Sequence, residues 1–175
     1  MDGKVLHRQN WCGTLEPRHS SCCTILSFQV PNVEVFAVRI TAQCEGHSDS
    51  NCYFFSTHSQ EIYRPYLELP APTLSVRLLE EQGRARTYEI ENTGTTAALH
   101  IHGFDRRDAC IFLPEDDFFT LFPGEKRQIH CMLYPRFNYG FDEYPSASLQ
   151  DGPEILFRAF PLDAPYAGGG RSMDE

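Results

Sequence analysis

His100 and His102 are the pair of side chains in this sequence that most resembles part of a metal site. They lie two apart in a segment that we expect to be a β-strand, so their side chains should share one face and could grip zinc. A complete site needs a further ligand, which His130 or Cys131 on a later predicted strand is placed to supply. Because histidines on a sheet are more often simply exposed or hydrogen-bonded, we predict no metal site and no cofactor.

Two other groupings fall short of a catalytic centre. A cysteine nucleophile would require Cys110 or Cys131 beside one of these histidines, and no third, orienting group is visible in the sequence. Glu115, Asp116 and Asp117 are consecutive carboxylates, but successive residues of a strand face opposite ways. We interpret them as a solvated acidic loop and predict no catalytic residues.

Composition and charge narrow the class of protein. The chain has 175 residues, 41% of them hydrophobic, which is enough apolar material for a globular core. Its formal net charge of −9 argues against a nucleic-acid or membrane partner, since phosphate is met by clustered cations. No segment approaches the roughly 20 apolar residues of a membrane helix, and the first eight residues do not read as a signal peptide. The sequence does not indicate the cellular compartment of the protein.

The seven cysteines are odd in number and irregular in spacing. This does not describe a small domain that disulfides hold together, and a chain of this length does not need them. We interpret the cysteines as free thiols that behave as small hydrophobic residues. One or two disulfides remain an alternative if the protein is exported.

Hydrophobic residues in the first third recur with a period of two, which predicts short strands. Asp2-Gly3 resembles a hairpin turn whose first strand is missing, so we expect the chain to begin inside a domain. Prolines at 65, 70 and 72 should prevent a long helix and stiffen a linker. We predict a partial immunoglobulin-like sandwich over 1–64 and a Pro-rich linker over 65–72. The expected strands are Lys4–His7, Thr24–Val30, Val33–Thr41 and, after a loop over 45–51, Cys52–Ser56.

Residues 73–162 have the pattern of a complete sandwich, with short strands and a turn signal roughly every 8–12 residues. Phe119 and Leu121 should face the core, each contributing roughly 1.5–3 kcal/mol if fully buried. Residues 163–175 should be a flexible tail. We therefore expect an all-β fold, an immunoglobulin-like β-sandwich preceded by a partial second sandwich. The strands expected in the complete sandwich are 74–79, 84–91, 98–104, 109–113, 118–121, 126–134 and 154–160.

An aromatic segment follows the long strand that ends this pattern. Because sugars stack on aromatic rings, the segment could border a glycan site. Exposed aromatic patches more often mark interfaces, so docking onto another domain is the favoured interpretation. The candidate contact residues are Phe137, Tyr139, Phe141 and Tyr144.

Three phrases occur in a fixed order along residues 74–134, namely Asn92-Thr93-Gly94, Phe112-Leu113-Pro114 and Asp116-Asp117-Phe118-Phe119-Thr120-Leu121-Phe122-Pro123-Gly124-Glu125. In this order they resemble the C-terminal immunoglobulin-like domain of glycoside hydrolase family 2 enzymes of the β-mannosidase branch. That branch includes exo-β-glucosaminidases and endo-β-mannosidases. Asp117 and Phe118 depart from the family, which usually has Asn and Tyr there. Upstream, Val33–Thr41 and Ser50–Ser56 resemble the preceding sandwich domain of the same enzymes.

The resemblance implies a non-catalytic part of a larger enzyme. Family relatives cleave a glycosidic bond with two glutamates on a separate (β/α)₈ barrel, for which this sequence has no βα units. No catalytic residue carries over. The implied partners are the catalytic (β/α)₈ domain of the same parent chain, which this portion would support, and a β-linked glycan whose cleft it would frame. The alternative is a free-standing carbohydrate-binding or protein-interaction sandwich module.

Overall fold

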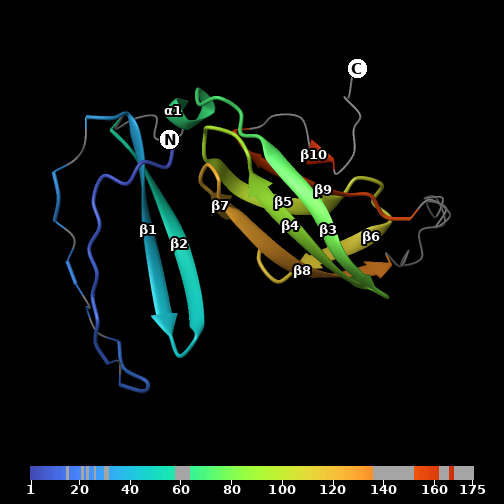
Figure 1. Cartoon of the computed structure of the whole chain (residues 1–175), viewed down its shortest axis with the longest axis horizontal. Coiled ribbons are helices and arrows are strands. Elements are labelled where there is room, and N and C mark those ends of the chain that lie inside the picture. The colour runs from blue at the N-terminus through green and yellow to red at the C-terminus, as the bar shows by residue number, and fades with distance from the viewer. Residues whose placement is uncertain are drawn as a thin grey trace, which may run out of the picture.

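A computed structural model gives the structure of residues 1–14, 16–20, 22, 24–25, 27–29, 32–57, 64–135, 152–161 and 166–167. These residues confirm the expected fold class: the structure is nearly all β, with antiparallel sheets arranged as a sandwich and a hairpin beside it (Figure 1). Among these residues, no helix has the length and apolar character that crossing a bilayer requires.

The hairpin consists of β1 (Val35–Cys44) and β2 (His47–Ser56), which pair along their whole length. Glu45 and Gly46 join them with φ values of 47° and 85°, the positive-φ pair of a tight hairpin turn. The expected loop over 45–51 was therefore wrong. A two-residue turn leaves polar residues from His47 onward free to continue the ladder, since backbone pairing does not depend on hydrophobic side chains.

Two further expected strands are not formed. Lys4–His7 has no regular structure, and neither do the described residues of 24–30. A strand needs a neighbour for its backbone groups, and within the described residues β1 and β2 pair only with each other. The start of the chain is held differently: the Met1 carbonyl accepts a hydrogen bond from Ala97 N at 2.9 Å.

The linker carries one helical turn, α1 (Arg64–Leu67). Its length agrees with the expectation that prolines keep any helix short. Beyond it, the two sheets of the sandwich have the strand orders β3-β4-β8-β6 and β10-β9-β5-β7. Their strands are β3 (Leu74–Gln82), β4 (Ala85–Asn92), β5 (Ala98–Asp105), β6 (Cys110–Pro114), β7 (Phe119–Leu121), β8 (Lys126–Pro135), β9 (Ile155–Phe160) and β10 (Tyr166–Ala167).

The strand order is that of an immunoglobulin-like domain. With β3, β4, β5, β6, β8, β9 and β10 taken as strands A to G, one sheet has the order A-B-E-D and the other G-F-C. The short β7 adds to the outer edge of strand C. β10 lies within the segment that we expected to be a tail, where Tyr166–Ala167 pairs with β9.

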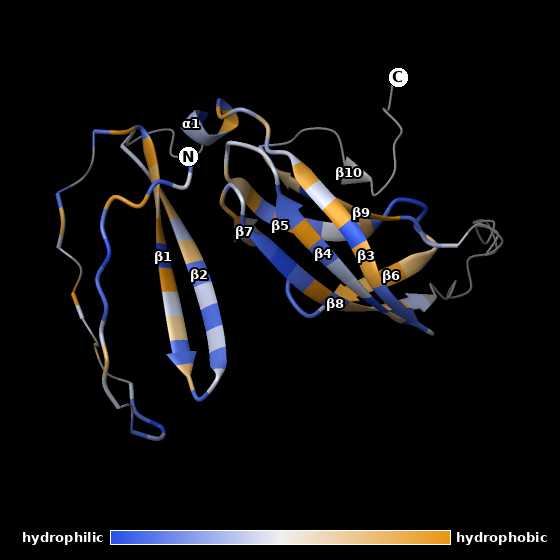
Figure 2. Ribbon diagram, viewed as in Figure 1, coloured by the Kyte–Doolittle hydropathy of each residue, from blue (hydrophilic) through white to orange (hydrophobic). Residues whose placement is uncertain are grey.

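The core forms where alternate residues of both sheets meet. Figure 2 shows hydrophobic and hydrophilic residues alternating along β3 and β4. As predicted, Phe119 and Leu121 face the core, and Tyr88 and Ile90 are buried with them. Phe157 of the opposite sheet packs edge-on against Tyr88 with ring centroids 5.4 Å apart. This core holds the two sheets of the sandwich together.

Candidate functional site

The hairpin and the sandwich meet at Glu125, the last residue of the phrase that carries the family resemblance. Its carboxylate accepts hydrogen bonds from both terminal nitrogens of Arg39 on β1, at 2.7 and 2.8 Å. It also accepts one from Phe122 N at 2.8 Å, which closes the turn before β8. The Arg39 guanidinium lies 4.5 Å above the Phe122 ring. The Glu125 carboxylate thus stabilises the turn before β8 and also holds the hairpin through Arg39.

These contacts change the acidity of both groups. Burial pushes the pKa of Glu125 upward, but the hydrogen bonds from Arg39 and Phe122 outweigh it and hold the pKa below its usual value of 4.5. The hydrogen bonds to Glu125 likewise raise the pKa of Arg39 above its usual range. The pair is therefore fully ionised at neutral pH, as a bidentate arginine–carboxylate contact requires.

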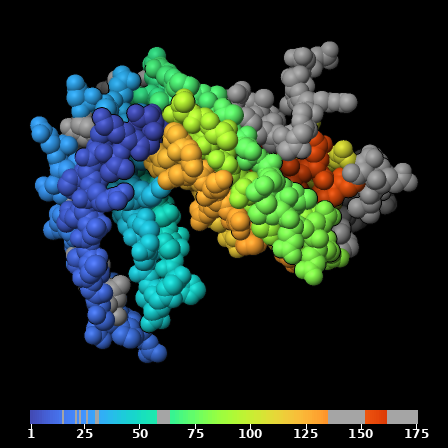
Figure 3. Space-filling model, in the orientation of Figure 1, coloured from blue at the N-terminus to red at the C-terminus, as the bar shows by residue number. Residues whose placement is uncertain are grey.

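An apolar cluster continues the junction beside this ion pair. Tyr66 of α1 is buried, and its hydroxyl donates a hydrogen bond to the Phe55 carbonyl at 2.6 Å and lies 3.1 Å from the Phe36 carbonyl, so it contacts both strands of the hairpin. Phe54 packs edge-on against Tyr66 and against His100 of β5. The space-filling view shows the two units touching at one end and separating farther along the hairpin (Figure 3). The contact is thus local and depends on few side chains.

Asn92 connects two of the sequence motifs that carry the family resemblance, the Asn-Thr-Gly turn and the Pro-Gly-Glu turn. Its fully buried side chain donates to the carbonyls of Thr96 (2.8 Å) and Leu121 (2.9 Å) and accepts from Gly94 N (3.0 Å). Its backbone exchanges hydrogen bonds with Gly124 and Glu125. The Asn-Thr-Gly turn therefore holds the Pro-Gly-Glu turn in place, and through it the carboxylate that clamps the hairpin.

A polar hollow of about 350 Å³ opens next to the Arg39–Glu125 pair. Three cations line it, but each meets a carboxylate: Arg39 meets Glu125, Lys126 meets Glu91 at 3.2 Å and Arg127 meets Asp116 at 2.7 Å. The positive charge of all three side chains is therefore neutralised by carboxylates, so this hollow has no excess positive charge with which to bind an anion.

The two histidines that suggested zinc diverge. A register shift interrupts β5 between residues 99 and 102, and His100 has a φ of 49°. His100 consequently contacts Phe54 of the hairpin, whereas His102 stacks on Phe118. The expectation assumed a regular strand, and the irregularity leaves the two imidazoles with different ring partners. Among the described residues, no group of three or more His, Cys, Asp or Glu side chains is placed to hold a metal ion.

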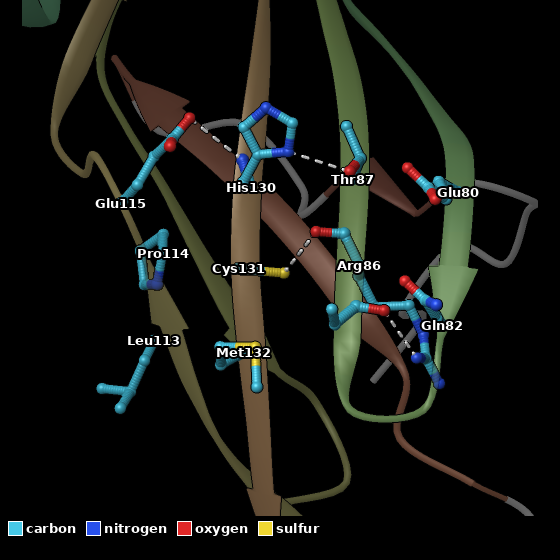
Figure 4. Close-up of a pocket in the computed structure, with 11 residues that line it drawn as sticks. Glu80, Gln82, Arg86, Thr87, Leu113, Pro114, Glu115, His130, Cys131 and Met132 are labelled. Atoms are coloured by element: carbon cyan, nitrogen blue, oxygen red, sulfur yellow. Dashed lines mark hydrogen bonds between the residues drawn. The ribbon is translucent and has the colours of Figure 1, made fainter.

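His130 and Cys131 border a hollow of about 400 Å³ on the other sheet (Figure 4). His130 Nδ1 shares a 2.9 Å hydrogen bond with the Thr87 hydroxyl, and the Cys131 thiol points to the Arg86 carbonyl at 3.5 Å. Burial raises the pKa of Cys131 to about 11, so the thiol is protonated at neutral pH. Cys110 is also buried. A protonated, buried thiol is a poor nucleophile, which argues against covalent chemistry at Cys131.

The three consecutive carboxylates each have a different partner. Glu115 accepts from His130 N at 3.2 Å, and Asp116 pairs with Arg127. Burial raises the pKa of Asp117, while hydrogen bonds from the amides of Phe118 and Gly103 partly offset this. The three groups have separate partners, and Glu115 and Asp117 are exposed, as the interpretation as a solvated acidic loop requires.

The predicted contact residues Phe137, Tyr139, Phe141 and Tyr144 lie outside the described residues. The structure instead shows an apolar surface on the outer side of β6 and β8. Ile111 faces Tyr134 and Leu113 faces Met132 in neighbouring cross-strand pairs, and all four side chains are exposed. The sequence carried a signal for it, since β6 is apolar at every position from Cys110 to Pro114 and so has no polar side to present to water.

Comparison of the chain with protein-family models, with curated proteins and with solved structures finds no match.

Proposed function

We propose that this chain is the non-catalytic C-terminal β-sandwich portion of a β-mannosidase-like glycoside hydrolase, where it braces the catalytic (β/α)₈ domain and frames the glycan cleft. The Arg39–Glu125 ion pair is the observation that carries this proposal. A brace must hold its parts in a fixed orientation, and this pair fixes the hairpin to the sandwich. Glu125 also ends the phrase on which the resemblance rests.

The apolar surface on β6 and β8 supports a neighbouring domain as partner. Exposed apolar side chains that adjoin one another mark interfaces more often than isolated ones do. A layer packed on this sheet would cover Ile111, Leu113, Met132 and Tyr134 together. The adjoining hollow in Figure 4 offers space for a side chain of that layer.

Two experiments test the proposal. The DNA that precedes the codon for Met1 should continue in frame into a (β/α)₈ domain with two suitably placed glutamates, and an in-frame stop codon directly upstream would contradict the proposal. The purified chain alone should not hydrolyse aryl β-mannoside or aryl β-glucosaminide. Turnover that survives repurification and is lost in a variant of this chain would show a catalytic centre here.

A free-standing protein-interaction module is the second candidate, and the same apolar surface favours it. The two candidates differ in their partner: the first requires a barrel encoded in the same reading frame, and the second a separate protein. Replacing Leu113 and Met132 with serine should raise the solubility of the chain in both cases. Only the DNA sequence separates them.

A further inference from the structure

The outer surface of the sheet β10-β9-β5-β7 carries a row of stacked side chains. His102 of β5 lies between the Phe118 ring, 5.3 Å away and nearly parallel at 17°, and the Phe104 ring, 5.7 Å away. Arg158, the cross-strand neighbour of His102, covers the Phe104 ring at 4.8 Å. The row therefore runs from Phe118, just before β7, over β5 to Arg158 of β9.

Phe118 breaks two rules of protein structure at once. The residue is 61% exposed, although His102 stacks on one side of its ring. Its φ is 57°, in the left-handed region that is costly for a bulky residue. The neighbouring Phe119, not Phe118, fills the core. Strained backbone and exposed aromatic rings are both concentrated at functional sites.

The groups around this ring define the ligand. Because Phe118 and His102 stack in parallel, the row presents a single flat ring and not the several inclined walls that enclose a cation. At its margin stands the Asp117 carboxylate, oriented by the Phe118 and Gly103 amides. It offers acceptor oxygens beside the apolar ring. A matching ligand has a flat face of C–H groups and hydroxyl donors along its edge.

A pyranose ring has both features, and we propose that Phe118 and Asp117 form a saccharide-binding site. The ring packs its C–H face on Phe118 and donates hydroxyl hydrogen bonds to Asp117. This inference deepens the proposed function, on which it rests for the presence of a glycan near this domain. It places a glycan contact on a surface that differs from the aromatic segment considered in the sequence.

The site can be tested by titrating the ¹⁵N-labelled full chain with methyl β-mannopyranoside and with β-1,4-mannobiose. Saturable shifts of the Gly103 and Phe118 amides are expected. Phe118→Ala should weaken binding roughly tenfold or more, the scale of one aromatic stacking contact. Phe118→Tyr should retain it, and Asp117→Ala should weaken it severalfold.

Phe55→Ala is the matched control. Phe55 is 44% exposed and stacks on Phe36 at 5.2 Å and 14°, much as Phe118 stacks on His102, but its backbone φ is not positive. This variant should bind both sugars as the wild type does. Equal loss in Phe55→Ala and Phe118→Ala, or equal shifts with glycerol, would overturn the proposal, as would tighter binding of choline than of either sugar.

Phe118→Gly separates a binding role from a structural one. Glycine accepts positive φ without strain, so this variant should keep the thermal midpoint of the wild type while binding is lost. Retained binding in Phe118→Gly would overturn the proposal, and so would an absence of saturable shifts in the wild type. Either failure would leave the bracing role untouched, because that role is decided by the reading frame and by the rigidity of the hairpin.

Discussion

Arg39 and Glu125 lie 86 residues apart in the chain and meet in a bidentate ion pair with N–O distances of 2.7 and 2.8 Å. The pair is half-exposed, so its net contribution is small compared with that of the core. Its importance is positional, since it joins the hairpin to a turn that Asn92 holds from within the sandwich. Mutations at these positions should therefore affect the junction before they affect the fold.

Replacing Glu125 with glutamine should loosen the hairpin. The amide keeps one acceptor but loses the charge and the bidentate geometry, at a cost of about 1 kcal/mol for a partly exposed pair. Hydrogen exchange should become faster for amides of β1 and β2 and stay unchanged in β4 and β8. Arg77→Gln, which breaks the exposed Arg77–Glu89 pair, is the control and should change neither. Uniformly faster exchange in Glu125→Gln would show that the pair supports the whole fold.

Acid should weaken the same junction. Because the folded pKa of Glu125 is lowered, its contribution to stability is fully present above the usual pKa of 4.5 and is lost as the pH falls through the lowered value. The difference in stability between the wild type and Glu125→Gln should therefore disappear in acid. Denaturation curves of both proteins at neutral and acidic pH measure it. A difference that grows in acid would contradict the assigned direction.

Asn92→Ala should be the most damaging polar substitution in the sandwich. It leaves two buried carbonyls and one amide without their partner, which costs roughly 3 kcal/mol or more. Thr93→Ala next to it is the control, since Thr93 is exposed and makes only a long 3.4 Å contact with the Thr73 carbonyl. Urea denaturation should place Thr93→Ala near the wild type. Similar midpoints for the two variants would exclude Asn92 as the anchor of the turn.

Gly103→Ala should destabilise the sandwich by overpacking. A Cβ there would come within 2.4 Å of the Phe112 ring and 3.0 Å of the Phe157 ring, and inserting a methylene into a filled core costs roughly 1–3 kcal/mol. Phe112→Leu in the same chain should recover part of the loss by making room. Thermal unfolding of the single and double variants measures both effects. If the double variant is instead destabilised by the sum of the two single effects, the methyl group at residue 103 does not clash with the Phe112 ring.

The sandwich could be predicted because its strands alternate. Tyr88 and Ile90 on β4, and Phe119 and Leu121 on β7, separate apolar from polar positions strictly enough for period two to identify the buried side. β2 was predicted too short because its first residues are polar, and strands that are paired but exposed carry no such pattern. The alternation of apolar and polar residues reveals a strand only where one side of it is buried. Most of the hairpin is exposed, so the first residues of β2 lack this alternation.

The candidate sites were harder to predict because they depend on distant residues. The partner of Glu125 comes from another unit, and no local pattern links it to Arg39. The irregularity at His100 arises where β5 meets two neighbours with shifted registers, so the spacing of His100 and His102 does not tell which side chain each histidine contacts. Phe118 was recognised as part of a motif, but its positive φ and exposed ring emerge only from the folded turn.

Residual dipolar couplings measure how rigidly Arg39 and Glu125 hold the hairpin to the sandwich. In the wild type, the amides of β1 and β2 and those of β4 and β8 should fit one alignment tensor. In Glu125→Gln, the hairpin should show reduced couplings while the sandwich keeps its own. Two different tensors in the wild type, or no change in the hairpin when Glu125 is replaced, would contradict a brace that is locked by Arg39 and Glu125.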